Sequence, residues 1–187
     1  MHSWAIPFYF LAFLLLFSCS SSSEQQDKQV FRYNESDGIT SLDPVFTRNL
    51  ENMWAVNQLF DGLVELDSAM NVIPSIAQSW QILDSGLTYK FTLRDDVYFH
   101  DHEIFPDGLG RKVTAQDFVY SFNRLLDPEI ASPGSWVLKQ IDLVNGGFEA
   151  LNDSTFKIIL KEPFAPFIGM LSMQYCTVVP HEIADHY

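Results

Sequence analysis

The stretch Leu87-Thr88-Tyr89-Lys90-Phe91-Thr92-Leu93-Arg94 alternates strictly between apolar and polar side chains. Successive side chains on a β-strand point to opposite faces, so this alternation predicts a strand with one face in a core and the other in water. Asp84-Ser85-Gly86 before it has the composition of a tight turn, and residues 80–83 are again rich in apolar side chains. We therefore expect a β-hairpin over residues 80–93.

A helix start follows further along the chain. Thr114 is a favourable N-cap, and Asp117 three residues later can complete a capping box by accepting a hydrogen bond from the Thr114 backbone. Apolar residues then recur on one helical face until Asp127-Pro128, where the residue before proline avoids helical geometry. The pattern predicts a helix over residues 114–126.

Weaker patterns predict the other elements. Thr47 is the expected N-cap of a helix whose apolar stripe begins with Leu50 and Trp54, and Pro74 is expected to open a short helix over residues 74–80. A further helical run is expected between Pro163 and position 173. Short strands are expected at residues 63–66, 97–99 and 155–160. Hairpins combined with scattered helices indicate a mixed α/β fold class.

The charge balance excludes one large class of function. The chain has 187 residues, with 11 Lys plus Arg against 24 Asp plus Glu, and a formal net charge of −13. Proteins that bind nucleic-acid phosphates need a basic face, so we expect no nucleic-acid partner. The 16 Phe and 4 Trp residues supply enough apolar surface for a buried core.

The first residues read as a targeting segment. Residues 5–17 form an apolar run that is shorter than the roughly 20 residues needed to span a membrane, as in a secretory signal peptide. Leu16-Phe17-Ser18-Cys19 then resembles the bacterial lipobox, whose cysteine is lipidated and becomes the mature N-terminus. The alternative is that Cys19 is an incidental cysteine in a signal peptide that is cut elsewhere.

Three parts of the chain follow from this interpretation. We expect a signal peptide over residues 1–18, a lipidated Cys19 with a polar tether over 19–29, and a folded part over 30–187. The lipid would hold the protein at a membrane of the cell envelope, with the folded part in the periplasm or on the outer side of the cytoplasmic membrane. Cys176 would be the second thiol of the chain, so we expect no disulfide within it.

Motifs for catalysis and cofactors are not found in the sequence. His100-Asp101-His102 offers three possible zinc ligands, but no further ligands follow at a suitable spacing. His181 and His186 are five residues apart, which puts them on different faces of a helix, whereas a zinc-protease helix needs a spacing of four. We therefore expect neither an enzyme nor a cofactor. A metal-binding surface lipoprotein that uses residues 100–102 remains an alternative.

Several motifs occur in a fixed order along the chain: Ser41-Leu42-Asp43-Pro44, Leu59-Phe60-Asp61-Gly62-Leu63-Val64, Ile76-Ala77-Gln78-Ser79-Trp80, Phe99-His100-Asp101, and Val113-Thr114-Ala115-Gln116-Asp117-Phe118. In this order they resemble the peptide-binding family of ABC-transporter substrate-binding proteins, which is family 5 of the bacterial extracellular solute-binding proteins. The resemblance runs from about residue 30 to residue 187.

The resemblance implies a fold and a function. The fold would be part of lobe I of a two-lobed periplasmic-binding-protein clamp, with the second lobe absent from this chain. The function would be that of a non-catalytic receptor that binds peptides outside the cytoplasm and delivers them to the permease and ATPase subunits of an ABC importer. A receptor of the same fold for nickel complexes, dipeptides or sugars is an alternative.

The resemblance also implies ligand contacts at Arg48, Asn49, Leu50 and Gly134. Gly134 stands where oligopeptide-binding members carry an aromatic residue, so either the pocket is wider here or Trp136 supplies the ring. The alternative for Trp136 is a position in the core. An arginine at the positive end of a helix is mildly unfavourable, which points to an anionic partner for Arg48, such as a ligand carboxylate.

Residues 102–112 form a longer loop than the family pattern has. Its Pro106, Asp107, Gly108 and Gly110 are typical of turns, and we expect an exposed decoration of the rim or an interaction surface.

Overall fold

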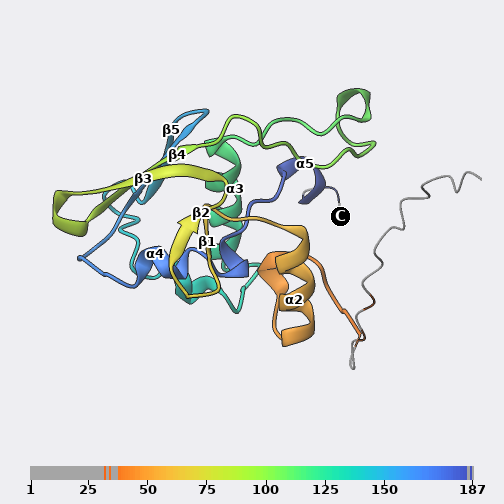
Figure 1. Ribbon diagram of the computed structural model, residues 1–187, viewed down its shortest axis with the longest axis horizontal. Coiled ribbons are helices and arrows are strands. Elements are labelled where there is room, and N and C mark those ends of the chain that lie inside the picture. Colours follow the sequence, from red (N-terminus) through yellow and green to blue (C-terminus); the bar gives the residue numbers. More distant parts are fainter. Residues whose placement is uncertain (1–31, 33, 35–37, 185, 187) are drawn as a thin grey trace, which may run out of the picture. The chain divides into compact units, whose positions relative to one another are not determined.

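Figure 1 shows a computed structural model of the protein, which describes residues 32, 34, 38–184 and 186. Contacts along the chain divide it into two units, Met1–Asn34 and Glu35–Tyr187, and every element named below belongs to the second. The predicted signal peptide over residues 1–18, Cys19 and the polar tether over 19–29 lie outside the described residues.

The second unit contains both helices and strands. The helices are α2 (Leu50–Leu59), α3 (Ala115–Leu126), α4 (Phe167–Met170) and α5 (His181–Ala184). The strands are β1 (Val64–Leu66), β2 (Val72–Pro74), β3 (Ala77–Leu83), β4 (Thr88–Leu93), β5 (Phe148–Asn152) and β6 (Thr155–Ile159). Single 3-10 turns include η2 (Pro44–Phe46), η3 (Asp84–Gly86), η4 (Pro106–Gly108), η5 (Ser135–Leu138) and η6 (Gln174–Cys176).

The predicted hairpin forms one edge of an antiparallel sheet with the strand order β3-β4-β6-β5. The turn at η3 reverses the chain with positive φ angles at Asp84 and Ser85. On β4, the side chains of Tyr89, Phe91 and Leu93 are buried, as the sequence alternation predicts. Figure 1 shows the hairpin projecting at the left of the view.

Helix α3 packs on β5 and β6 and closes the core of the sheet (Figure 1). The rings of Phe118 and Phe122 lie 5.7 and 5.5 Å from the ring of Phe156 on β6, and all three side chains are fully buried. The predicted capping box is confirmed, because the Asp117 carboxylate accepts a hydrogen bond of 2.8 Å from the Thr114 backbone N–H.

The remaining strands and the last helical run differ in part from their predicted bounds. The strand predicted over 155–160 is confirmed as β6, and residue 160 continues it only as a single bridge to Ile141. The strand predicted over 63–66 is confirmed as β1, which pairs with β2 in a separate two-stranded ribbon. The helical run after Pro163 is shorter than predicted. It consists of α4, which packs against β1. Strand β5 was not predicted.

Two predictions for residues 74–99 are wrong. Residues 74–80 form no helix, because the backbone N–H groups of Ile76 and Ala77 donate to the carbonyls of Gly62 and Leu63 and hold the chain extended. Residues 97–99 form no strand, because their pairing is limited to a single bridge between Tyr98 and Lys112.

Helix α2 begins later than predicted and turns a different face to the core. Its N-cap is Asn49 rather than Thr47, whose hydroxyl instead donates to the Pro44 carbonyl. The helix buries Asn52 and Val56, whereas Leu50 and Trp54 of the predicted apolar stripe are 60% and 48% exposed. Asn52 is buried because its side chain bonds to both the backbone N–H and the hydroxyl of Thr40.

The packing of α3 gives a direct test of the core. Truncation of Phe118 to alanine should lower the free energy of unfolding by about 3–5 kcal/mol, because it leaves a cavity between α3 and the sheet. The measurement is the urea midpoint followed by circular dichroism. Thr92→Ala on β4 is the control, since Thr92 is exposed. Equal midpoints for the two variants would contradict this description of the core.

Candidate functional site

The segment that carries three of the predicted contact residues is tightly folded. Asp43 starts it as the cap of η2, since its carboxylate accepts a 3.2 Å hydrogen bond from the Val45 N–H, and Pro44 has the backbone geometry of a first helical position. The same carboxylate pairs with Arg124 in the last turn of α3. The side chain of Val45 is buried.

The backbone carbonyls of this segment face inward. The Ser132 hydroxyl donates to the Val45 carbonyl at 2.6 Å, and the Tyr175 hydroxyl donates to the Thr47 carbonyl at 3.0 Å. Both hydrogen bonds are buried, so they hold the turn against two distant parts of the chain. Side chains, rather than these two carbonyls, are therefore what the segment offers to a ligand.

Gly134 belongs to the same cluster through Tyr175. A Cβ atom at position 134 would lie only 2.2 Å from the Tyr175 ring, so glycine is needed for this close approach. The Gly134 N–H also donates to the Ser132 hydroxyl. The turn at residues 45–47, which directly precedes the predicted contact residues 48–50, thus shares the partners Ser132 and Tyr175 with Gly134. A buried packing role explains Gly134 without reference to a ligand.

The other predicted contact residues lie at the surface. Arg48 is exposed, and Trp136, in η5, is 53% exposed, which contradicts the alternative of a core position for its ring. Leu50 is exposed at the first position of α2. Asn49 is half-buried, and its side chain caps α2 by accepting from the Asn52 N–H at 3.1 Å. Ligand contact by these residues remains a prediction.

A cavity of about 690 Å³ has Asp43, Pro44 and Phe46 in its wall. Its lining is mostly apolar, with polar groups from Asp43, Asp61, Arg124 and residues 100–102. The described residues that line it do not include any of the five predicted contact residues, although Phe46 of η2 does line it. The sequence interpretation did not identify this cavity, because its walls come from segments far apart in the chain.

The histidine motif is held by hydrogen bonds of the 102–112 loop. The Asp101 carboxylate accepts from the Gly110 N–H at 2.9 Å, and Nδ1 of His102 accepts from the Ile104 N–H at 3.2 Å. Within residues 38–184, no three His, Cys, Asp or Glu side chains are grouped so as to hold a metal ion. The structure therefore does not favour the metal-binding alternative based on His100.

The 102–112 loop is anchored rather than loose. Phe105 is only 3% exposed and stacks on Phe99 with ring centroids 6.3 Å apart. The guanidinium group of Arg111 lies 5.0 Å from the centre of the Phe99 ring. The prediction of exposed turns holds for residues such as Asp107 and Leu109, but the loop also contributes a buried aromatic residue.

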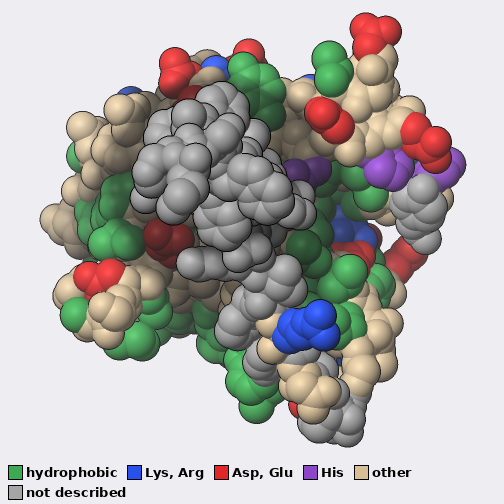
Figure 2. Space-filling model, turned by 45° about the vertical axis from the view of Figure 1, so that its right-hand side comes forward, with side chains coloured by type: hydrophobic (Ala, Val, Ile, Leu, Met, Phe, Trp, Pro, Cys, Tyr) green, Lys and Arg blue, Asp and Glu red, His purple; other side chains and the backbone are tan. Residues whose placement is uncertain are grey.

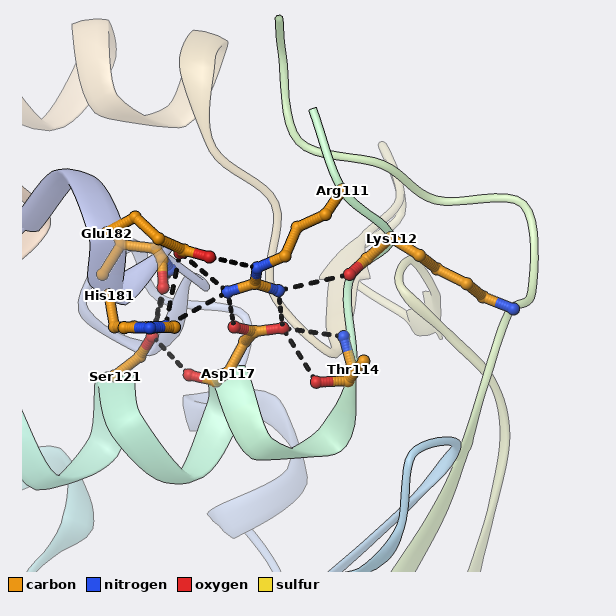
Figure 3. A network of polar contacts seen from close by, with 8 residues as sticks. Arg111, Lys112, Thr114, Asp117, Ser121, His181 and Glu182 are labelled. Atoms are coloured by element: carbon orange, nitrogen blue, oxygen red, sulfur yellow. Dashed lines mark hydrogen bonds and ion pairs between the residues drawn. The ribbon is translucent and has the colours of Figure 1, made fainter. Parts of the chain in front are cut away.

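Arg111 connects the loop to two helices (Figure 3). It donates to both carboxylate oxygens of Asp117, at 2.6 and 2.8 Å, and also to both oxygens of Glu182 on α5. The hydrogen bonds that Arg111 donates to Asp117 raise the pKa of the Arg111 guanidinium, and those that it donates to Glu182 lower the pKa of the Glu182 carboxyl. The network joins α3, α5 and the loop.

On the face drawn in Figure 2, acidic side chains occur at several separate places and not in one cluster. Among the described residues Cys176 is a free cysteine, and burial raises the pKa of its thiol to about 12, so it is unreactive at neutral pH.

Across the described part of the chain, no helix has the length and apolar character of a membrane span.

Comparisons with known proteins identify the class. A family model described as "Bacterial extracellular solute-binding proteins, family 5 Middle" matches residues 71–186. The probable deoxycholate-binding periplasmic protein YgiS of Escherichia coli K12 is 32% identical over 98% of this chain and 35% of its own length. The periplasmic murein peptide-binding protein MppA of the same strain is 31% identical over 77% of this chain and 28% of its own length.

Solved structures agree with this assignment. The periplasmic binding protein DppA of Helicobacter pylori, in complex with the peptide STSA, is 29% identical and superposes with a TM-score of 0.68 over 79% of this chain and 30% of its own. The fold is therefore a mixed α/β part of lobe I of a two-lobed periplasmic-binding-protein clamp. The chain belongs to family 5 of the bacterial extracellular solute-binding proteins. It spans about a third of the length of the relatives it matches.

The Arg111 network gives a prediction on pH dependence. The folded pKa of Glu182 lies below its ordinary value of 4.5, so the ionised carboxylate stabilises the fold above that pH, and the stabilisation is lost as the pH falls through the folded pKa. Glu182→Gln should therefore lower the free energy of unfolding by about 1–2 kcal/mol at pH 7, with the difference closing in acid. Urea unfolding between pH 7 and pH 3 measures it.

The matched control is Glu65→Gln, which removes an exposed carboxylate on β1. A difference between Glu182→Gln and the wild type that is the same at both ends of the pH range would show that the charge of Glu182 does not stabilise the fold.

Proposed function

We propose that this chain is part of a non-catalytic receptor that binds peptides outside the cytoplasm and delivers them to the permease and ATPase subunits of an ABC importer. The observation that carries the proposal is that Ser132 and Tyr175 hold the turn directly before residues 48–50, through the carbonyls of Val45 and Thr47, and that both also contact Gly134. Membership of family 5 supports the receptor class, and the peptide named in the DppA complex supports the cargo.

The chemistry of the exposed side chains fits a peptide. Leu50 and Trp136 offer apolar surface to peptide side chains, and the Arg48 guanidinium can pair with a carboxylate. Trp136 provides a large rigid contact area, which is typical of residues that contribute strongly to binding. A receptor of this kind needs no nucleophile and no cofactor, and the buried thiol of Cys176 is consistent with that.

A second cargo is favoured by one observation. YgiS, which matches almost the whole chain, is named as a probable deoxycholate-binding protein. A steroid acid combines a carboxylate with an apolar body, so Arg48 together with Trp136 is suited to it as well. Peptide and steroid acid should compete for the same residues.

Calorimetric titration of the purified protein with tripeptides, and separately with deoxycholate, tests both cargoes. We expect peptide binding, with Arg48→Ala and Trp136→Ala each weakening it by about 1 kcal/mol or more, which is roughly fivefold in Kd. Tryptophan emission should shift to shorter wavelength on binding, since the ring of Trp136 would leave water.

Lys157→Ala is the control for this titration, because Lys157 lies on β6 and pairs with Glu149. Binding of deoxycholate alone would change the proposed cargo and keep the site. Equal affinity in the wild type and in the Arg48 and Trp136 variants would move the site elsewhere.

We also propose that Cys19 is lipidated and holds the receptor at a membrane of the cell envelope, in the periplasm or facing outward. The lipobox-like sequence and the polar residues after it support this, and a lipid with more than one acyl chain would anchor stably.

Cys19→Ser should release the protein from the membrane fraction or block removal of residues 1–18. Fractionation and mass spectrometry of the mature N-terminus measure these effects, with Ser20→Ala as the control. A wild-type protein that is soluble and begins at another residue would exclude lipidation at Cys19.

A further inference from the structure

Asp43 belongs to the Ser41-Leu42-Asp43-Pro44 motif, and its carboxylate is engaged by Arg124 within the protein at the wall of the cavity of about 690 Å³. Arg124 Nη1 and Nη2 donate to its two oxygens at 3.2 and 2.8 Å, in a two-pronged pair. The side chains of Arg124 and Asp43 are 14% and 29% exposed, so water screens the pair only partly.

The ion pair acts on the backbone as well as on the side chains. Oδ1 of Asp43 accepts one hydrogen bond from the Val45 N–H and a second from the Arg124 side chain. The turn at η2 and the last turn of α3 are therefore bonded to the same oxygen. Arg124 is itself well placed, because a cation is favoured at the C-terminal end of a helix. Helix α3 is fixed in the core by Phe118 and Phe122.

Arg48 follows Asp43 by five residues. The carbonyls of Val45 and Thr47 are already held by Ser132 and Tyr175, and the Asp43–Arg124 pair adds a connection from the start of the segment to α3. Loss of that connection would free the first turn, and the outward residues that follow it would sample more orientations. A binding site loses affinity when its residues must be ordered on binding.

From this geometry we infer that Arg124 is a positioning residue, which holds residues 48–50 in their ligand-binding orientation through Asp43 without touching the ligand. The inference rests on the proposed function. Its test therefore includes a measurement that needs no ligand.

The variants are chosen to separate positioning from general stability. Arg124→Met removes the charge and keeps the length of the side chain, and Arg124→Lys keeps the charge without the two-pronged geometry. Arg94→Met is the matched control, since Arg94 makes a similar pair with Asp96 at 2.9 and 3.0 Å, where the side chains are 47% and 65% exposed.

Hydrogen exchange of the intact protein is the first measurement. Arg124→Met should raise the exchange rates of the amides of Val45, Phe46 and Thr47 by about tenfold, with the amides of β4 unchanged. Arg124→Lys should have a smaller effect, and Arg94→Met should leave these three amides as in the wild type. Unchanged exchange at residues 45–47, or an equal increase throughout β4, would overturn the inference.

Peptide affinity is the second measurement, as a double-mutant cycle. We expect Arg124→Met to raise Kd by about tenfold in the wild-type background and by less than about twofold when residues 48 and 50 are already alanine. Equal losses in both backgrounds would show that Arg124 does not act through those residues, and would overturn the inference. If the wild type binds no peptide, the proposed function fails, and the exchange rates alone decide whether Arg124 orders the segment.

Discussion

The packing of α3 against β6 is the contact on which the rest of this structure depends. Phe118 and Phe122 place two rings of the helix against Phe156 of the sheet, in a region from which water is excluded. This apolar contact fixes the position of the helix. Residues at the two ends of the helix can then anchor the neighbouring segments by ion pairs.

Each end of α3 holds such a segment by an arginine–aspartate pair. At the N-terminal end Asp117 binds Arg111 and so connects the 102–112 loop and α5 to the helix. At the C-terminal end Arg124 binds Asp43 and so connects the segment that carries Arg48. The signs follow the helix dipole, with the acidic residue in the first turn and the basic residue in the last. Both pairs are partly shielded from water, so the geometry of each pair affects the stability of the fold more than it would in a fully exposed pair.

Elements that depend on residues close together in the sequence could be predicted, whereas elements that depend on distant contacts could not. The alternation around Phe91 and the capping box at Asp117 depend on neighbouring residues, and both predictions are confirmed. The helix predicted after Pro74 is wrong because the backbone there pairs with Gly62 and Leu63, a contact that no local pattern encodes. The buried face of α2 was missed because it combines Val56 with a polar residue, Asn52, whose hydrogen bonds are satisfied by Thr40.

The same distinction applies to the candidate site. The prediction grouped Arg48 with Gly134 only through a family resemblance, and the groups that join their segments, Ser132 and Tyr175, were not identified. The pair of Arg111 with Glu182 was not identified either, because 71 residues separate the two partners in the sequence. Hydrogen bonds between distant segments depend on the completed fold, and a single sequence contains no periodic signal for them.

The pairing of Asp43 with Arg124 bears on what its motif can reveal about cargo. A carboxylate that accepts from Arg124 and from the Val45 N–H is engaged within the protein, so the motif specifies a turn and its attachment to α3. In the proposed binding mode, a ligand meets the outward side chains that follow, Arg48 and Leu50. A peptide and a steroid acid both present a carboxylate and apolar surface to such side chains. The motif therefore identifies the fold, and the choice between the two proposed cargoes depends on the chemistry of these few exposed residues.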